Sequence, residues 1–279
     1  GVTKEYLRYA LNGNIGRIID KAHGGVGLQH ITKKELVEID IPILSEDQQK
    51  QIVTVLDSVD KLIASRNEQL AKLDQLVKSR FIELFGDPQS NPYGYQYAKL
   101  SDIATYFNGL TYKPENVTEE GTIVLRSSNI QNSQLDFADT VRVDCAIKER
   151  LMVQENDILM CSRNGSAKLV GKVALIKGIQ EPMSFGAFMM IIRSQYFGYL
   201  MTYFQMDAFR QQIKTGATTT INQITGRMLD DVTIPLPPTA LVDQFTAFVE
   251  QTDKSKLAIQ QSLDKLETLK KSLMQEYFG

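Results

Sequence analysis

The fold is decided by residues 45–88, which read SEDQQKQIVTVLDSVDKLIASRNEQLAKLDQLVKSRFIELFGDP. The stretch opens with Ser45, followed three residues later by Gln48. This is a capping box, in which each side chain accepts a hydrogen bond from the other residue's backbone amide. It closes with Gly86-Asp87-Pro88, a helix-terminating glycine and a proline that cannot continue a helix. Because no Gly or Pro interrupts the interior, the pattern predicts one continuous helix over 45–85.

Apolar residues recur along this helix at spacings of three, four or seven, which is the heptad pattern of a coiled coil. They are Ile52, Leu56, Val59, Ile63, Leu70, Leu73, Val77 and Leu84, with Arg66 and Arg80 as interruptions. A helix of this length extends roughly 60 Å at 1.5 Å per residue. That is too long for one wall of a compact core, so we expect a partner helix.

The partner lies in the same chain, because the sequence repeats without a gap at a constant offset (224 − 31 = 193). The matches include Ile31-Thr32 with Ile224-Thr225, Ile41-Pro42 with Ile234-Pro235, and Phe85-Gly86 with Phe278-Gly279. A repeat of long period dictates architecture. We therefore predict a second long helix over 237–279, capped by Thr239 and paired antiparallel with the first.

The two helices carry different residues at equivalent positions of their seams. Ile63, Val77, Arg66 and Arg80 of the first correspond to Lys256, Lys270, Ile259 and Leu273 of the second. Because the two seams differ in their residues, the pattern favours pairing of the first helix with the second. The alternative is that each helix packs on its own globular domain.

The repeat divides the chain into five parts. They are a remnant at 1–43, the first long helix at 44–86, a linker at 87–97, a complete globular domain at 98–236 and the second long helix at 237–279. Residues 1–43 match the end of the complete domain, so we expect them to be the C-terminal remnant of a first domain of the same kind. Within the remnant the pattern predicts a helix over 5–22, a loop over 23–27 and a strand over 36–43.

The complete domain reads as α/β, so the chain as a whole is α+β: one α/β domain, two long helices and the remnant. Short apolar runs between polar turns predict strands over 122–125, 157–160, 172–176, 187–192 and 232–236. A late helix is predicted over 196–214, followed by a loop over 215–220.

Composition excludes several classes of protein. The net charge of −2 does not indicate a polyanion partner for the whole chain. The two cysteines, Cys145 and Cys161, form no metal or disulfide pattern and are typical of reduced thiols in a cytosolic protein. There is no signal peptide and no apolar run long enough to cross a membrane. We therefore expect a cytoplasmic protein with no membrane partner.

The sequence contains no recognisable catalytic motif. The only histidines are His23 and His30, and no metal cluster, catalytic triad or nucleotide-binding loop can be assembled. Asn91-Pro92-Tyr93 is related to the substrate loop of amino-methyltransferases, but a proline is missing and no glycine-rich loop precedes it. A linker turn is the better interpretation. We expect no catalytic centre, no metal site and no cofactor in this chain.

Three polar loops remain as candidates for binding DNA. Arg can fork onto guanine, Asn and Gln onto adenine, and Ser, Thr and Lys can bind phosphates. The candidate residues are Arg126, Ser128 and Asn129 in the first loop, Arg163, Asn164, Ser166 and Lys168 in the second, and Lys214, Thr218, Thr219, Thr220 and Asn222 in the third. The complete domain has equal numbers of acidic and basic residues. The prediction of DNA binding therefore depends on segments in which basic residues outnumber acidic ones. From 162 to 180 there are four basic residues and no acidic one.

The spelling of several segments resembles the target-recognition domains of type I restriction-modification specificity subunits. These segments are Leu125 to Ile130, Asn156 to Leu159 leading to Arg163-Asn164-Gly165, Leu169 to Ala174, Ile224-Thr225 leading to Ile234 to Pro238 and Gln244, and Phe85 to Pro88 followed by Asn91-Pro92. The resemblance covers essentially the whole chain. It implies two target-recognition domains, each reading half of a bipartite DNA site, held apart by antiparallel spacer helices.

The resemblance also implies partners. Modification subunits would carry S-adenosylmethionine and methylate adenine, and restriction or translocase subunits can join them. The specificity subunit itself would hold no cofactor and would not be catalytic. This chain departs from the family pattern because only residues 1–43 represent the first recognition domain. A homodimer would restore the symmetry of such a partial subunit.

Two readings of function stay open on these grounds. In the first, the chain is the DNA-recognition subunit of a restriction-modification complex. In the second, it is a coiled-coil scaffold whose globular domain binds protein and never DNA. An enzyme is disfavoured by the missing chemistry.

Overall fold

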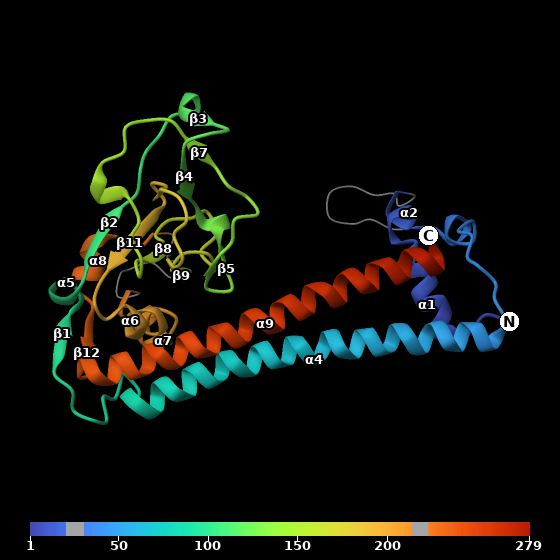
Figure 1. The fold of residues 1–279 in the computed structure, drawn as a ribbon, viewed down its shortest axis with the longest axis horizontal. Coiled ribbons are helices and arrows are strands. Elements are labelled where there is room, and N and C mark those ends of the chain that lie inside the picture. The colour runs from blue at the N-terminus through green and yellow to red at the C-terminus, as the bar shows by residue number, and fades with distance from the viewer. Residues whose placement is uncertain (21–30, 214–222) are drawn as a thin grey trace. The chain divides into compact units, whose positions relative to one another are not determined.

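The computed structural model describes residues 1–20, 31–213 and 223–279 (Figure 1). These residues form two compact units. One contains Gly1–Leu76 together with Gln251–Gly279, and the other contains Val77–Glu250. We call them the split unit and the continuous unit, because only the first is assembled from two separated segments.

The first long helix, α4, spans Glu46–Phe85 and begins at the predicted capping box. The Gln48 amide donates to Ser45 Oγ at 3.3 Å, and the Ser45 amide donates to Gln48 Oε1 at 3.1 Å. At the other end Gly86 has a φ of +72°, a left-handed conformation that favours glycine, and its amide donates to the Ile82 carbonyl at 2.8 Å. Both predicted ends of the helix are confirmed.

The second long helix, α9, spans Thr239–Phe278, which is the span of α4 shifted by the repeat offset at both ends (239 − 46 = 278 − 85 = 193). The predicted helix is confirmed, but the prediction that Thr239 is its cap is wrong. Thr239 is already helical. The carbonyl of Pro238 accepts from the amides of Leu241 at 3.0 Å and Val242 at 3.3 Å, so the cap lies one residue earlier.

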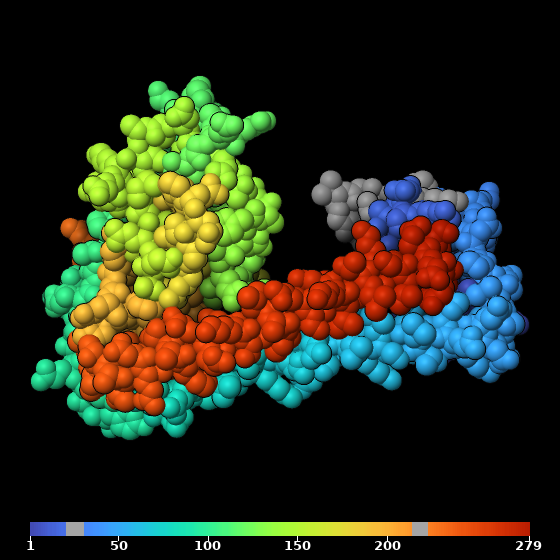
Figure 2. Space-filling view, viewed as in Figure 1, coloured from blue at the N-terminus to red at the C-terminus, as the bar shows by residue number. Residues whose placement is uncertain are grey.

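Within the split unit, α4 and α9 lie side by side (Figure 2). The polar contacts that join them include Lys270 Nζ to Asp60 Oδ1 at 2.7 Å, Lys256 Nζ to Asp74 Oδ1 at 2.7 Å, and Arg66 Nε to Ser262 Oγ at 3.2 Å. Residue numbers rise along α4 as they fall along α9, so the pair is antiparallel as predicted. The residues that interrupt the apolar seams make these contacts. The alternative, in which each helix packs on its own globular domain in place of the other helix, is wrong.

The beginning of the chain forms short helices in the split unit. They are α1 (Lys4–Gly13), α2 (Ile15–Asp20) and α3 (Lys33–Leu36). The single helix predicted over 5–22 is interrupted at Asn14, whose side-chain amide donates to the Ala10 carbonyl at 2.9 Å and so competes with the helix backbone. The loop predicted over 23–27 lies outside the described residues.

The strand predicted over 36–43 is wrong. Residues 37–45 have no regular structure, and among the described residues the split unit contains no strand. In the continuous unit the equivalent segment does form a strand, β12 (Thr233–Pro235), because β1 (Tyr97–Lys99) pairs with it. A strand requires a neighbour to take its ladder of hydrogen bonds, and the segment near Pro42 has none among these residues.

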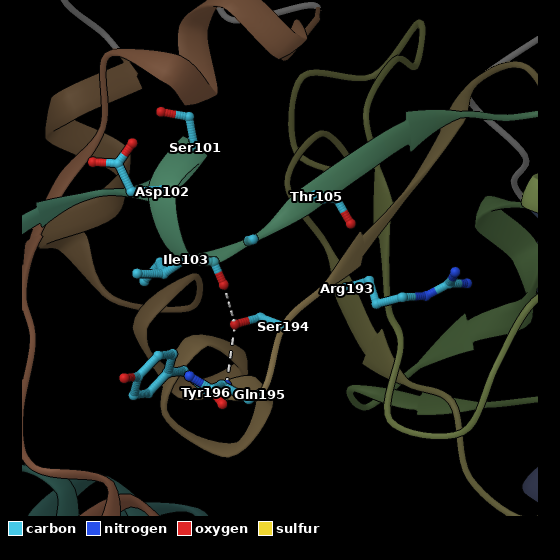
Figure 3. A pocket seen from close by; sticks show the side chains of 9 residues that line it. Ser101, Asp102, Ile103, Thr105, Arg193, Ser194, Gln195 and Tyr196 are labelled. Atoms are coloured by element: carbon cyan, nitrogen blue, oxygen red, sulfur yellow. Dashed lines mark hydrogen bonds between the residues drawn. The ribbon is translucent and has the colours of Figure 1, made fainter.

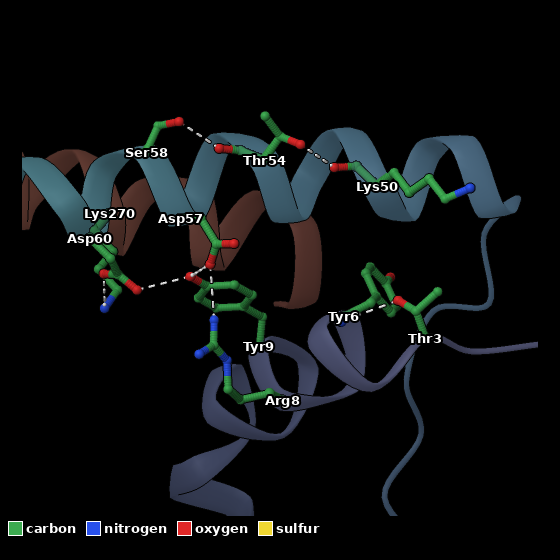
Figure 4. Close-up of polar contacts among 10 residues, drawn as sticks. All are labelled: Thr3, Tyr6, Arg8, Tyr9, Lys50, Thr54, Asp57, Ser58, Asp60 and Lys270. Atoms are coloured by element: carbon green, nitrogen blue, oxygen red, sulfur yellow. Dashed lines mark hydrogen bonds and ion pairs between the residues drawn. The ribbon is translucent and has the colours of Figure 1, made fainter.

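A polar cluster fastens α1 to α4 (Figure 4). The Tyr9 hydroxyl lies 2.7 Å from Asp57 Oδ1 and 2.9 Å from Asp60 Oδ2, and its single proton serves one carboxylate at a time. Arg8 donates to Asp57 at 3.0 Å, and Lys270 of α9 binds Asp60. Burial, with added contributions from the two carboxylates, raises the pKa of Tyr9, so the phenol stays a donor.

The continuous unit contains two four-stranded sheets. The first has the order β2 (Thr105–Asn108), β11 (Met189–Arg193), β8 (Ile158–Cys161) and β9 (Val173–Leu175), all antiparallel. The second has the order β10 (Met183–Phe185), β4 (Thr122–Leu125), β7 (Arg142–Val143) and β3 (Val117–Thr118). Its β10–β4 pair is parallel. A small hairpin joins β5 (Ile130–Gln131) to β6 (Gln134–Leu135).

The first sheet is buried on both faces. Side chains alternate across a strand, and along β8 Ile158 and Met160 pack into the core with the helices while Leu159 and Cys161 pack into the core with the second sheet. This two-sided burial explains the continuous apolar run of β8. The strands predicted over 122–125, 157–160, 172–176, 187–192 and 232–236 are confirmed as β4, β8, β9, β11 and β12.

The remaining helices of the continuous unit are short. They are α5 (Leu100–Ile103), α6 (Phe197–Tyr203), α7 (Asp207–Ile213), α8 (Gly226–Asp230) and the 3-10 turns η1 (Pro114–Asn116), η2 (Ser127–Asn129) and η3 (Glu149–Leu151). The single helix predicted over 196–214 is therefore two helices. Tight hydrogen bonds, from Gln205 to Thr202 and from Met206 to Tyr203, turn the chain between them.

The end of each long helix packs on an equivalent tyrosine. In the continuous unit the rings of Phe85 and Tyr199 lie 5.0 Å apart, and in the split unit those of Phe278 and Tyr6 lie 5.2 Å apart. Both pairs are related by the repeat offset, so the repeat predicted from sequence is also a repeat of packing. Aromatic pairs at this separation add to the energy of burial.

Candidate nucleic-acid interface

Two of the predicted loops meet in the continuous unit. The first, 126–129, follows β4, and the second, 162–168, follows β8 in the other sheet. Asn164 Nδ2 donates to Ser127 Oγ at 3.3 Å across the junction. The turn 186–188, between β10 and β11, contacts both strand ends: the Gly186 amide donates to the Leu125 carbonyl at 2.9 Å, and the Ser162 amide donates to the Phe188 carbonyl at 3.0 Å. The sheets thus bring the two loops to one place.

Arg126 is only partly available for binding. Its Nη2 contacts Asp139 Oδ2 at 2.7 Å, and its Nε is buried without a hydrogen-bond partner. The guanidinium therefore already has a carboxylate on one edge. An ion pair between side chains this exposed contributes little stability, so a phosphate or a base could displace Asp139.

Asn129 does not face solvent, and its selection as a base-reading residue is wrong. The side chain is fully buried. Its Nδ2 donates to the carbonyls of Asp136 and Asp139, each at 2.8 Å, and its Oδ1 accepts from the Arg126 amide at 2.8 Å. These contacts hold the loop together. Ser128, the neighbouring candidate, is half-buried.

Arg163 is exposed, and its guanidinium carbon lies 5.5 Å from the centre of the Phe188 ring. Its backbone amide donates to the Phe188 carbonyl at 3.0 Å. Of the basic candidates in the described loops, Arg126 has an ion-pair partner, whereas Arg163 and Lys168 have none among the described residues. Lys168 and Ser166 are exposed, and the Ser166 amide donates to Asn164 Oδ1 at 2.9 Å.

The third predicted loop lies outside the described residues, together with its candidates Lys214, Thr218, Thr219, Thr220 and Asn222. The chain that follows it is placed. The Ile224 amide donates to the Ser162 carbonyl at 2.7 Å, and Gln223 forms an antiparallel bridge with Arg163.

Sequence reasoning missed Phe188 and Ser127. Phe188 falls within the run 187–192 that predicts a strand, whereas the strand actually begins at Met189. In the structure Phe188 is 59% exposed. The preceding Gly186 was the available signal, because a glycine at the edge of an apolar run often marks a turn.

A shallow hollow of about 470 Å³ lies between α5 and the start of α6 (Figure 3). Two of its polar side chains are already engaged. Ser194 Oγ donates to the Ile103 carbonyl at 2.6 Å and accepts from the Tyr196 amide at 3.0 Å, while Arg193 binds the buried carboxylate of Asp157 at 2.7 Å. These contacts give Ser194 and Arg193 a structural role.

The parts of the chain that the structure describes contain no cluster of His, Cys, Asp or Glu suited to a metal ion. None of their helices combines the length and the apolar character needed to cross a membrane. Burial raises the pKa of the Cys161 thiol, which is the state of an unreactive core cysteine.

Comparison with known proteins decides the family. The family model described as "Type I restriction modification DNA specificity domain" matches residues 2–75 and 92–274. The chain belongs to this family. As a member of the type I specificity family, it is 28% identical over 183 residues to the EcoKI specificity subunit of Escherichia coli (strain K12). It is 25% identical over 174 residues to the MjaVIII specificity subunit of Methanocaldococcus jannaschii.

These matches cover 61% and 57% of this chain but only 39% and 41% of the two relatives. The chain thus spans about two fifths of the length of the curated relatives that it matches. Among solved structures, the type I S subunit from M. genitalium aligns with a TM-score of 0.61 at 17% identity, covering 99% of this chain and 72% of that one. A chain from a structural study of type I complex assembly and conformational transition gives 0.60 at 16%, covering 99% and 71%. The type I specificity fold is therefore shared.

Proposed function

We propose that this chain is a non-catalytic DNA-recognition subunit of a type I restriction-modification complex, and that its continuous unit reads half of a bipartite site. The observation that carries the proposal is the meeting of the loops 126–129 and 162–168 around Asn164 and Ser127, with Arg163 exposed and without a carboxylate partner among the described residues. Family membership supports the same reading.

The charge of the chain favours base reading over capture by phosphates. With a net charge of −2, attraction to the DNA backbone is modest, and affinity falls further as salt releases counterions. Specificity would come from side chains that reach base edges in the major groove. We infer that tight binding requires partner subunits that add their own contacts to DNA.

The partners that we propose are modification subunits, which would bind S-adenosylmethionine and methylate adenine, and restriction or translocase subunits joined to them. The chain itself would hold no cofactor and would act in the cytoplasm. A solved structure with the same fold comes from a study of complex assembly in the type I restriction-modification system. A second copy of this chain is a further proposed partner, which would supply the reader for the other half-site.

The test of DNA recognition is selection from a pool of randomised duplexes by the full chain, alone and with its modification subunit. We expect recovery of a defined sequence and weaker binding as salt rises. If neither preparation enriches any sequence, and binding is the same for every duplex, the scaffold reading replaces this one.

We also propose that the paired helices set the spacing between half-sites. Deleting residues 63–69 from α4 with 261–267 from α9 removes the layer containing Arg66 and Ser262 but keeps the ion pairs at Asp60 and Asp74. Seven residues shorten a helix by roughly 10 Å, or about three base pairs at ~3.4 Å each. The preferred spacer should shorten accordingly while the bases read stay the same. An unchanged spacer preference refutes this role.

A further inference from the structure

The backbone of Arg163 is held from two sides. On one side the amides of Ser162 and Arg163 both donate to the Phe188 carbonyl at 3.0 Å. On the other side the Ser162 carbonyl accepts from the Ile224 amide at 2.7 Å, and Gln223 bridges Arg163. Rigid placement of a side chain lowers the entropy lost on binding. These backbone contacts therefore suit a residue that must bind a ligand in one geometry.

Phe188 contacts Arg163 through its ring as well as through its backbone carbonyl. Its side chain is 59% exposed on a turn whose two ends are fixed to β4 and β8, and the Arg163 guanidinium carbon lies 5.5 Å from the ring centre. Burial of apolar surface does not explain a phenylalanine in this position. Attraction between a cation and the ring face does.

The two arginines of the interface differ in how they are held. The guanidinium of Arg126 presents an edge donor to the carboxylate of Asp139, which occupies the group that would otherwise bind a base. A ring instead attracts the cation through its face and makes no hydrogen bond, so the donors of Arg163 keep their capacity. The ring of Phe188 thus restrains Arg163 and still leaves both hydrogen-bond donors of the guanidinium fork free for a base. The carboxylate of Asp139 does not leave both donors of Arg126 free.

We propose that Phe188 is a positioning residue for Arg163, and that it holds the guanidinium for forked contact with O6 and N7 of a guanine. The inference rests on the proposed DNA-recognition function and names the base type that this part of the site selects. Arginine forked onto guanine is the commonest specific contact in the major groove. Phe188 itself makes no base contact in this proposal.

The test is a double-mutant cycle in the full chain, measured as binding to the selected duplex and to duplexes in which each base pair is changed singly. Arg163→Ala should lower the preference for one G·C pair by roughly 5- to 150-fold. Phe188→Leu should lower preference at that same pair by roughly two- to fivefold, and Phe188→Tyr should keep it, because its ring still faces the cation. In the Arg163→Ala background, Phe188→Leu should have no further effect.

Phe197→Leu is the matched control. Phe197 also lies under a cation, with Lys177 Nζ 5.2 Å from its ring centre, but it belongs to α6 and not to the loops. Its substitution should leave base preference unchanged. The slope of affinity against salt should stay the same in Phe188→Leu, since no phosphate contact is lost.

Two failures are distinguishable. If Phe188→Leu and Arg163→Ala act independently, or at different base pairs, Phe188 contacts DNA by itself or not at all, and the positioning role is refuted while DNA recognition stands. If the unaltered chain selects no sequence, DNA recognition fails and this inference fails with it.

Discussion

The hydroxyl group of Tyr199 donates a buried hydrogen bond to the backbone carbonyl of Pro235 at 3.0 Å. Tyr6 makes the same bond to the carbonyl of Pro42, also at 3.0 Å. The two bonds are related by the repeat offset (199 − 6 = 235 − 42 = 193). The repeat thus extends to single hydrogen bonds. One ties α1 to the segment before α4, and the other ties α6 to the segment before α9.

Removing these hydroxyls should have unequal effects. Tyr199→Phe leaves the buried carbonyl of Pro235 without a partner and should lower the stability of the continuous unit by about 1–3 kcal/mol. Tyr6→Phe should cost the split unit less, about 0.5–1.5 kcal/mol, because Pro42 is exposed and water can replace the donor. Hydrogen exchange resolved by unit measures both. Equal losses would show that solvent access to the carbonyl does not set the cost.

Two helical glycines should respond in opposite directions to alanine. At Gly198 in α6 an added Cβ would lie 3.0 Å from Thr246 Cβ in α9 and closer still to its hydroxyl oxygen, so the helices would have to separate. The overpacking cost of about 1–3 kcal/mol exceeds the gain in helix propensity of up to about 1 kcal/mol. Gly198→Ala should therefore destabilise the continuous unit.

Gly16 in α2 is the matched site, since an added Cβ there meets nothing within 4 Å. Gly16→Ala should stabilise α2 by about 0.5–1 kcal/mol. Thermal unfolding of both variants, together with hydrogen exchange in α6 and α2, measures the two effects. A stabilising Gly198→Ala would mean that α6 and α9 approach less closely than described.

The Asp60 carboxyl should make stability depend on pH. Burial acts to raise its pKa, but hydrogen bonds from Lys270 and Tyr9 and the positive charges of Lys270 and Arg8 outweigh burial, so the pKa lies below its ordinary value. A carboxyl with a lowered folded pKa contributes stability that is complete above its unfolded pKa of about 4 and is lost as pH falls through the folded value. The advantage over Asp60→Asn should be full near pH 6 and shrink below about pH 4.

Unfolding of the parent chain and of Asp60→Asn across this pH range provides the measurement, with Lys270→Gln as a second background. Without Lys270 the stability difference caused by Asp60→Asn should narrow above about pH 4, where the carboxyl is ionised. A difference that stays constant down to about pH 3 would contradict the described network.

Asn129 should affect stability before it affects recognition. Asn129→Ala removes a buried amide that makes three hydrogen bonds within the loop, and we expect a loss of about 2–4 kcal/mol in the continuous unit. The neighbouring Ser128→Ala, at a half-buried site, should change stability by less than about 0.5 kcal/mol. Denaturant unfolding compares them. If Asn129→Ala were as stable as the parent and changed only base preference, Asn129 would be a base-contacting residue after all.

Sequence reasoning succeeded where a signal is local or repeated. The capping box at Ser45 and Gln48, the left-handed Gly86 and the constant offset between the halves fix both ends of α4 and locate α9. It failed where a partner decides the outcome. The segment before Pro42 reads as a strand, like its equivalent, but a strand forms only beside another strand, and composition does not record that.

The candidate interface was predictable in outline and not in detail. Polar loops after buried strands could be found from the sequence, and two of the three are described and lie together. Which side chains face outward could not be found. Asn129 and Arg163 are equally polar in the sequence, yet one is sealed under its own loop and the other lies open beside Phe188. Orientation is set by contacts between segments far apart in the chain.

The split unit joins segments that are far apart in the chain, since the ring of Tyr6 packs on that of Phe278, 272 positions later (278 − 6 = 272). A ribosome adding about 5–20 residues per second needs roughly 15 to 55 s to supply that ring. The continuous unit can close during this interval, while α1 waits for its aromatic neighbour. The order of synthesis and the order of burial thus run in opposite directions, because α1 is made before the continuous unit and buried after it.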